Sequence, residues 1–348
     1  MKKTVFMLTF ILISAFYVAA KPRIIILATG GTIAGVGTSG DRAGYTAGKI
    51  PVSELIGSIP YAADVADITG EQISSVGSQN MTIDIWKKLA VRINEIFAKN
   101  EADGIVITHG TDTQEETAYF LNLVVKDNRP VVLTGAMRSS TSISADGPKN
   151  LYDAIVVASS TESKGKGVIV CFNESIFDPR EVTKTSSTKV NGFKAPETGP
   201  LGEVFDGKVT YYKSSLRASG NKSPFSVNQD IKLPKVEIVY MYADASPDYI
   251  LNLVKQKVDA IVIAGVGNGN FSDQFNDAIK KAVKSKIIVC RASRCESGRV
   301  VLDGEVNDNE LGTIVSDDLN PQKARILLML GLTTTKDVKK LQELFFQY

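Results

Sequence analysis

Runs of apolar residues without polar alternation recur along the first half of the chain. The β-branched run at 23–27 is typical of a parallel strand that is buried on both faces. Between such runs, apolar residues recur at helical spacing, as Trp86, Leu89 and Ile93 do after the capping residue Thr82. This alternation predicts a mainly parallel, doubly wound α/β sheet. The predicted strands are 23–27, 104–108, 130–134 and 167–172, and the predicted helices are 83–97, 114–126 and 148–160.

A second, smaller α/β unit follows a segment rich in glycine, proline, serine, threonine and lysine. That segment, 173–234, is typical of hairpins and then a linker. We therefore expect a first domain at 21–212, a linker at 213–234 and a second domain at 235–348. The second domain has predicted strands at 236–240, 260–264 and 287–290, and helices at 247–257, 272–284 and 319–325, with Asn320 capping the third of these and Thr335 capping a final helix.

Two hydroxyl-rich turns follow predicted strands of the first domain. ATGGTIAG at 28–35 places Thr32 at the carboxyl end of a strand, where open α/β sheets bind their ligands. HGTDT at 109–113 places Thr111 and Asp112 at the end of another strand. Taken alone, the first is explained equally well by a glycine turn with a threonine cap, and the second by a helix N-cap. Two such turns in one domain favour a catalytic site, with Thr32 as the candidate nucleophile.

The first twenty residues have the pattern of an export signal. Lys2 and Lys3 precede an apolar run, and the small residues at 18–20 predict cleavage after Ala20 and a soluble periplasmic or secreted protein that begins at Lys21. Removing those two lysines reduces the 40 basic residues to 38, equal to the 38 acidic residues. This balance indicates neither a nucleic-acid partner nor a membrane-surface partner.

His109 is the only histidine of the chain, and it lies two residues before Thr111. A Ser-His-Asp site would have to use this imidazole, so we expect a structural histidine and a base drawn from lysine, tyrosine or a carboxylate. The three cysteines are too dispersed to form a metal site with it. Cys290 and Cys295 lie five residues apart, a spacing that permits a local disulfide without requiring one.

Together with further motifs in order along the chain, the two turns resemble the signatures of the bacterial L-asparaginases. The resemblance covers essentially the whole chain after residue 20, and the exported start is similar to that of the periplasmic, type II branch. It implies hydrolysis of L-asparagine to L-aspartate and ammonia through an acyl-threonine intermediate, weaker action on L-glutamine, and no metal or cofactor. The further motifs are GYTAGKI at 44–50, GEQISSVGSQNMT at 70–82, ADGPKNLY at 145–152, TKT at 183–185, AGVGNGN at 264–270, GEVND at 304–308 and LNPQKAR at 319–325.

The resemblance also implies a role for individual residues in the chemistry. Thr32 would be acylated, with Tyr45 beside its hydroxyl. Thr111, Lys184 and Asp112 would form a second relay, in which a neutral amine acts as base and the carboxylate orients it.

Other matching residues would bind the substrate. Ser78 and Gln79, together with Asp112, would hold its α-carboxylate and α-ammonium groups, which need paired partners inside a closed site. Asn270 and Glu305 match residues that a neighbouring subunit contributes in this family. The resemblance therefore implies a homotetramer with shared active sites.

Two other functions compete with this interpretation. A periplasmic amino-acid-binding protein fits export and two α/β domains, although it would not need two threonine turns, a lysine and a tyrosine. A dinucleotide-binding protein fits less well, because AGVGNGN at 264–270 lacks the third glycine at the required spacing. The chain also departs from the family at Ser139, where proline is usual, which predicts a looser turn there.

Overall fold

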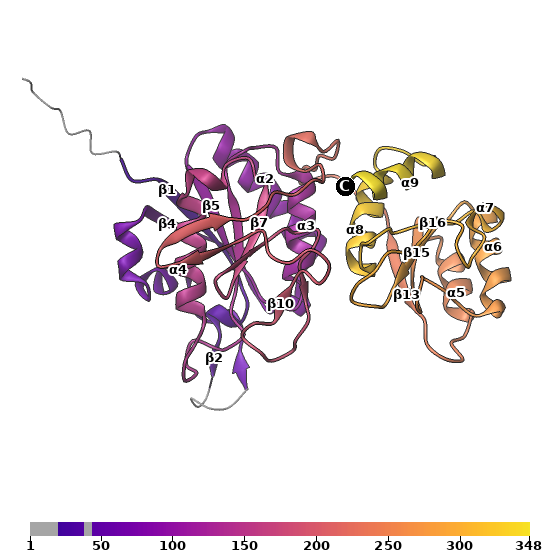
Figure 1. Ribbon diagram of the computed structural model, residues 1–348, viewed down its shortest axis with the longest axis horizontal. Coiled ribbons are helices and arrows are strands. Elements are labelled where there is room, and N and C mark those ends of the chain that lie inside the picture. The colour runs from indigo at the N-terminus through magenta and orange to yellow at the C-terminus, as the bar shows by residue number, and fades with distance from the viewer. Residues whose placement is uncertain (1–19, 38–43) are drawn as a thin grey trace, which may run out of the picture.

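The computed structural model describes residues 20–37 and 44–348. They form two α/β domains, arranged as Figure 1 shows. Apart from Ala20, the predicted export signal lies outside the described residues. Among the helices of the described part, none has the length and apolar character needed to cross a membrane.

The first domain is built on an eight-stranded sheet with the order β12-β11-β8-β7-β6-β5-β1-β4. The strands from β4 to β7 pair in parallel, and the hairpin strands β8, β11 and β12 add an antiparallel edge. This confirms the predicted parallel-dominated sheet. The strands are β1 (Arg23–Gly30), β4 (Asp67–Val76), β5 (Gly104–Thr108), β6 (Val131–Thr134), β7 (Val168–Phe172), β8 (Ser175–Phe177), β11 (Gly202–Phe205) and β12 (Lys208–Tyr211).

Helices cover both faces of this sheet, which explains the apolar runs of its strands. In β1, Ile25 and Leu27 belong to the same buried cluster as α2 and α3, whereas Ile24 and Ile26 pack with α1 and α4 on the opposite face. Thr82 caps α2 as predicted, accepting a hydrogen bond from the Ile85 nitrogen. The helices are α1 (Val52–Gly57), α2 (Ile83–Ala98), α3 (Gln114–Val124) and α4 (Gly147–Ser159).

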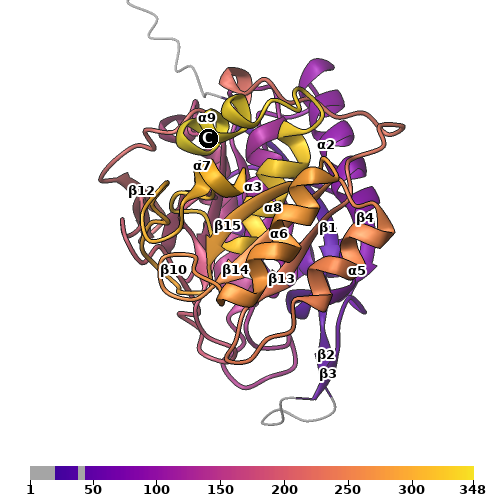
Figure 2. The ribbon, with the colours of Figure 1, turned by 90° about the vertical axis from the view of Figure 1, so that its right-hand side faces the viewer.

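The second domain has a four-stranded parallel sheet with the order β13-β14-β15-β16. Helices α5 and α6 cover its outer face, towards the viewer in Figure 2. On the other face, α8 and α9 lie towards the first domain, and residues of α8 share one buried apolar cluster with α2 and α3. The elements are β13 (Val236–Tyr240), β14 (Ala260–Gly265), β15 (Ile288–Ser293), β16 (Ile314–Val315), α5 (Asp248–Gln256), α6 (Asn276–Lys284), α7 (Asp308–Leu311), α8 (Pro321–Gly331) and α9 (Val338–Gln347).

The ends of the last two helices differ in how well the sequence predicts them. Asn320 caps α8 as predicted, but α8 continues to Gly331 because its later turns are apolar and buried. Thr335 was the wrong cap for α9. Asp337 is the N-cap, and its carboxylate accepts from the Lys340 nitrogen, while the Thr335 hydroxyl accepts from the Asp337 nitrogen.

The cysteines are free thiols. Cys290 is buried in β15 and Cys295 is exposed after it, so the disulfide that their spacing permits is not formed. In the part of the chain that the structure describes, no group of three or more His, Cys, Asp and Glu side chains could hold a metal ion.

Candidate active site

Parallel pairing brings the two hydroxyl-rich turns to the same edge of the first sheet. β1 and β5 are neighbours, with Ala28 opposite Thr108, so the turns that follow them lie side by side. Gly31 has a φ of 80°, and a β-carbon there would lie 2.3 Å from the main-chain nitrogen of Gly110. Only glycine permits this backbone contact, which sets Thr32 beside the second turn.

Thr32 is 6% exposed, and its Oγ1 lies 2.5 Å from the hydroxyl of Tyr45. Tyr45 belongs to β3 (Tyr45–Thr46), which pairs with β2 (Val36–Gly37). Its ring lies against Gly35, where a β-carbon would be 2.6 Å from a ring carbon. Close packing and the short hydrogen bond therefore fix the phenol over the threonine hydroxyl.

A second polar group forms around Lys184. Its Nζ donates to Thr111 Oγ1 over 2.8 Å and to the Asp112 carboxylate over 2.6 Å. Lys184 lies on β9 (Thr183–Lys184), which pairs with β10 (Phe193–Lys194). The Lys184 side chain is 15% exposed and that of Asp112 is 58% exposed, so the carboxylate is accessible to a ligand.

The two groups line one cavity of 530 Å³. No residue of the second domain contributes to its wall. Serines and other side chains from two loops complete the lining. The lining residues are Thr32, Tyr45, Thr111, Asp112, Met137, Arg138, Ser139, Ser142, Ile143, Ser144, Lys184, Ser187 and Thr188.

Ser78 and Gln79 follow β4 in a short 3-10 turn beside the second hydroxyl-rich turn. Ser78 is buried, and its Oγ accepts from the Asp112 nitrogen over 3.1 Å. Its carbonyl oxygen accepts from the Thr113 hydroxyl over 2.8 Å. Gln79 is exposed, and neither residue lines the 530 Å³ cavity. Ser78 thus holds the backbone of Asp112 in this structure.

Asn270 and Glu305 lie in the second domain, away from the threonines of their own chain. The Asn270 Nδ2 donates to the Glu305 carboxylate over 2.7 Å, and both line a separate hollow of 440 Å³ beside α6 and α7. The Asn270 Oδ1 is buried and has no hydrogen-bond partner among the described residues. Asn270 and Glu305 are the only two predicted site residues that do not belong to the first domain.

His109 is fully buried and hydrogen-bonded at both ring nitrogens, as expected of a structural histidine. Trp86 Nε1 donates to the Thr117 hydroxyl over 2.7 Å. The Gly110 carbonyl can only accept, so the neutral imidazole carries its proton on Nδ1, and the Thr117 hydroxyl donates to His109 Nε2 over 2.9 Å. His109 Nδ1 then donates to the Gly110 carbonyl over 2.7 Å. Burial lowers the pKa of His109 to about 4, so the imidazole is neutral at physiological pH.

Hydrogen bonds close the turn at Ser139, where the sequence predicts a looser turn than in the family. Ser139 is buried, its hydroxyl lies 2.8 Å from that of Ser142, and its carbonyl accepts from the Ser142 nitrogen. Thr141 accepts from the Gly37 nitrogen over 2.8 Å, which ties this turn to β2. Hydrogen bonds thus close the turn without the rigidity of proline.

Glu115 is a site residue that the sequence did not indicate. Its position at the start of α3 suggested no more than an acidic first turn, yet it is 3% exposed and accepts from the main-chain nitrogen of Lys184 over 2.6 Å. The contact spans 69 residues, and a local sequence pattern carries no signal for it.

The fold and the site define this chain as a two-domain α/β protein with two threonine turns at one edge of its first sheet. Comparison with known proteins identifies the family. A family model described as "Asparaginase, N-terminal" matches residues 23–217, and one described as "Glutaminase/Asparaginase C-terminal domain" matches residues 235–345. The chain belongs to this asparaginase family.

Similar proteins match over nearly the whole chain. L-asparaginase 2 of Escherichia coli (strain K12) is 49% identical over 329 residues, which cover 94% of each chain. A protein of Haemophilus influenzae named "Probable L-asparaginase periplasmic" is 47% identical, covering 94% of this chain and 93% of its own. The crystal structure of a "Probable Cytoplasmic L-asparaginase from Campylobacter jejuni" superposes with a TM-score of 0.91 at 48% identity, covering 94% of this chain and all of that one.

Proposed function

We propose that this protein is an L-asparagine amidohydrolase that releases L-aspartate and ammonia through an acyl-threonine intermediate, with weaker action on L-glutamine. The observation that carries the proposal is that two threonine hydroxyls, each with its own proton-transfer partners, line a single cavity. Family membership supports the substrate class, because the matching models carry the names asparaginase and glutaminase.

In the first half of the reaction, Thr32 Oγ1 attacks the side-chain amide carbon of the substrate. Tyr45, 2.5 Å away, takes the hydroxyl proton and delivers it to the departing nitrogen, which leaves as ammonia when the C–N bond breaks. In the second half, water attacks the acyl ester, and Thr111 passes a proton of that water to Lys184. The proton held by Lys184 then returns to Thr32 Oγ1 as the ester C–O bond breaks. This step releases aspartate and regenerates the hydroxyl of Thr32.

The substrate's charged groups suit the remaining polar residues. The exposed carboxylate of Asp112 pairs with the α-ammonium group, and the α-carboxylate is assigned to Ser78 and Gln79, which lie beside Asp112 but outside the cavity wall in this structure. Asp112 also pairs with Lys184, so a substrate ammonium would share the carboxylate that now contacts Lys184.

We further propose a homotetramer in which Asn270 and Glu305 of one subunit complete the cavity of another. Both residues lie outside the cavity of their own chain, and within the described part of the chain the Oδ1 of Asn270 has no hydrogen-bond partner. Closed symmetric assemblies make such reciprocal sharing possible, since the same contact is formed twice across a two-fold axis.

Mixing two inactive variants tests the shared site. Thr32→Ala and Glu305→Ala are unfolded together and refolded, so that half of the two-fold pairs are hybrids. In a shared arrangement each hybrid has one site with both lesions and one with neither, so we expect about a quarter of wild-type activity to return.

The matched control mixes Thr32→Ala with Lys184→Met, whose lesions both lie in the first domain. Every site of that mixture keeps one lesion, so no activity should return. Mass spectrometry establishes that hybrids are present. Hybrids without activity in the Thr32→Ala and Glu305→Ala mixture would refute the shared site.

Exported protein provides the test of the activity itself. We propose a periplasmic location, which the Lys2-Lys3 start and the small residues before Lys21 support, so the purified protein should begin at Lys21 by mass analysis. Steady-state assays should then show ammonia released from L-asparagine and more slowly from L-glutamine. Tight binding of intact asparagine without ammonia would favour the amino-acid-binding alternative instead.

A further inference from the structure

One buried carboxylate connects the group around Lys184 with the second domain. Glu115 Oε2 accepts from the main-chain nitrogen of Lys184 over 2.6 Å. Its Oε1 accepts from Asn320 Nδ2 over 2.9 Å and from Gln322 Nε2 over 2.7 Å. Three N–H donors and the N-termini of α3 and α8 stabilise this carboxylate, and the charges of Lys323 and Glu116 lie near enough to interact with it.

Asn320 uses both ends of its amide in this arrangement. Its Oδ1 accepts from the Lys323 nitrogen over 3.0 Å and so caps α8, while its Nδ2 points to Glu115. A cap needs only the acceptor, which serine or aspartate supplies equally well. The donor half of the amide is therefore used for the contact between domains.

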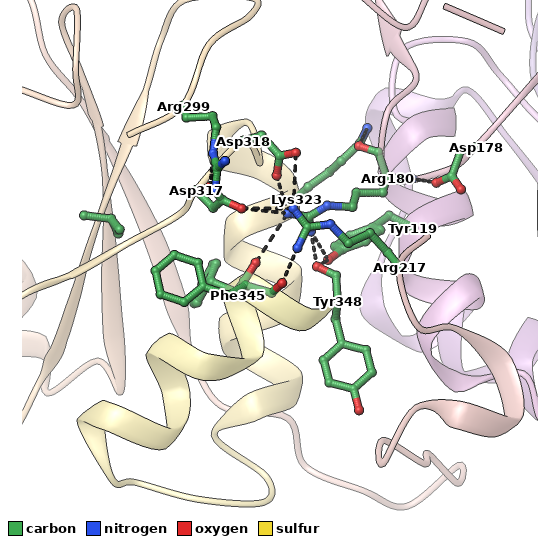
Figure 3. Close-up of polar contacts among 12 residues, drawn as sticks. Tyr119, Asp178, Arg180, Arg217, Arg299, Asp317, Asp318, Lys323, Phe345 and Tyr348 are labelled. Atoms are coloured by element: carbon green, nitrogen blue, oxygen red, sulfur yellow. Dashed lines mark hydrogen bonds and ion pairs between the residues drawn. The ribbon is translucent and has the colours of Figure 1, made fainter. Parts of the chain in front are cut away.

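The first turn of α8 also holds the segment that precedes Lys184. Lys323 is 1% exposed, and its Nζ donates to the carbonyls of Arg180, over 2.9 Å, and of Val182. Figure 3 shows Lys323 and Arg180 between α8 and α3, with the Arg180 guanidinium bonded to Asp318 and to the carbonyl of Tyr348. The segment that leads into the strand of Lys184 is thus held by the second domain at Arg180 and at Val182.

We propose that Glu115 is a positioning residue through which α8 of the second domain sets the distance between Lys184 Nζ and Thr111 Oγ1. Glu115 lies two residues after the turn that carries Thr111 and Asp112, so a single side chain fixes both members of the relay relative to each other. Proton transfer depends on the 2.8 Å contact between Lys184 Nζ and Thr111 Oγ1, and small displacements of reacting groups are costly. This inference rests on the proposed function, because it concerns the relay of that reaction.

Glu115→Gln tests the proposal. In glutamine, one of the two carboxylate oxygens is replaced by an NH₂ group. That NH₂ group would face either the Lys184 nitrogen of β9 or the side-chain amides of α8, and because two donors cannot pair, β9 or α8 must move away. We expect kcat for asparagine to fall by about 10- to 100-fold with little change in KM, and the pH profile of kcat to shift, because the relay is displaced while substrate contacts remain. If the variant only reduced the fraction of folded protein, the apparent kcat would fall by the same factor at every pH, and the shape of the profile would not change.

Glu116→Gln is the matched control, since Glu116 lies on the same helical turn and has no hydrogen bond to β9. It should retain the wild-type kcat below pH 7, where Glu116 is itself protonated because burial raises its pKa to about 7. Asn320→Ser keeps the cap of α8 but removes one donor to Glu115, so it should lower kcat in the same direction and to a smaller extent. This variant also decides the question by the same assay if Glu115→Gln does not fold.

Outcomes for the proposal and for the function are separable. Wild-type protein that releases no ammonia from asparagine would overturn the proposed function before any variant is made. With an active wild type, an unchanged kcat and pH profile in folded Glu115→Gln, or an equal change in Glu116→Gln, would overturn the positioning role alone.

Discussion

Thr32→Ala is expected to lower kcat for L-asparagine by about 10⁴-fold or more while the protein stays folded. The reason is that the hydroxyl of Thr32 is the proposed nucleophile, and among the described residues no second hydroxyl shares its 2.5 Å contact with Tyr45. Rapid-quench mass spectrometry with asparagine should detect an acyl adduct on the wild type and none on the variant. Circular dichroism and the unfolding midpoint report whether the fold is kept.

Thr32→Ser is the matched control, because it keeps a hydroxyl at the same place and removes one methyl group. It should retain adduct formation and a substantial part of the rate. An adduct of the same mass on Thr32→Ala would assign the nucleophile to another residue, and Thr111 would then be the first to examine.

Lys184→Met should lower kcat by about 10³-fold at every pH, whereas His109→Gln should keep a substantial rate. Methionine fills the space of the lysine stem but can neither take a proton from Thr111 nor pair with Asp112. His109 is neutral and fully hydrogen-bonded, and a glutamine amide can offer a donor to Gly110 and an acceptor to Thr117. Kinetic pH profiles of both variants provide the measurement.

The His109 variant also has a predictable effect on stability. The folded-state pKa of about 4 lies below the ordinary 6.5, so this group contributes stability that is present above pH 6.5 and is lost as the pH falls through 4. His109→Gln should flatten the unfolding free energy over that window. A Lys184→Met enzyme that remains active beside an inactive His109→Gln enzyme would show that the relay is wrongly assigned.

Residues at strand ends were the part of the site that the sequence could predict. Thr32 and Thr111 follow uninterrupted apolar strands, and parallel neighbours end at the same sheet edge, so local pattern and topology place them together. The placement of Tyr45 and Lys184 required resemblance to a family, because a loop residue and a lysine in a polar segment have no periodicity to reveal them.

Contacts between distant segments were not predictable in the same way. Glu115 meets Asn320 across 205 residues, and nothing near Glu115 distinguishes it from an ordinary acidic helix start. Asp337 replaces the predicted cap Thr335 because both are good capping residues two positions apart, and only the backbone geometry selects between them. Side-chain choices of this kind depend on tertiary packing.

The placement of α8 restricts how this chain can be recombined with its relatives. Although α8 belongs to the second domain, its apolar residues share one core with α2 and α3, and its first turn contacts Glu115 and the segment just before the strand of Lys184. In a chimaera that joins this first domain to a relative's second domain through the linker, the relative's α8 would therefore pack against α2 and α3 of this chain. For exchange of parts, the natural module is the first domain together with α8, and a swap of second domains must carry over the α3 surface that α8 contacts.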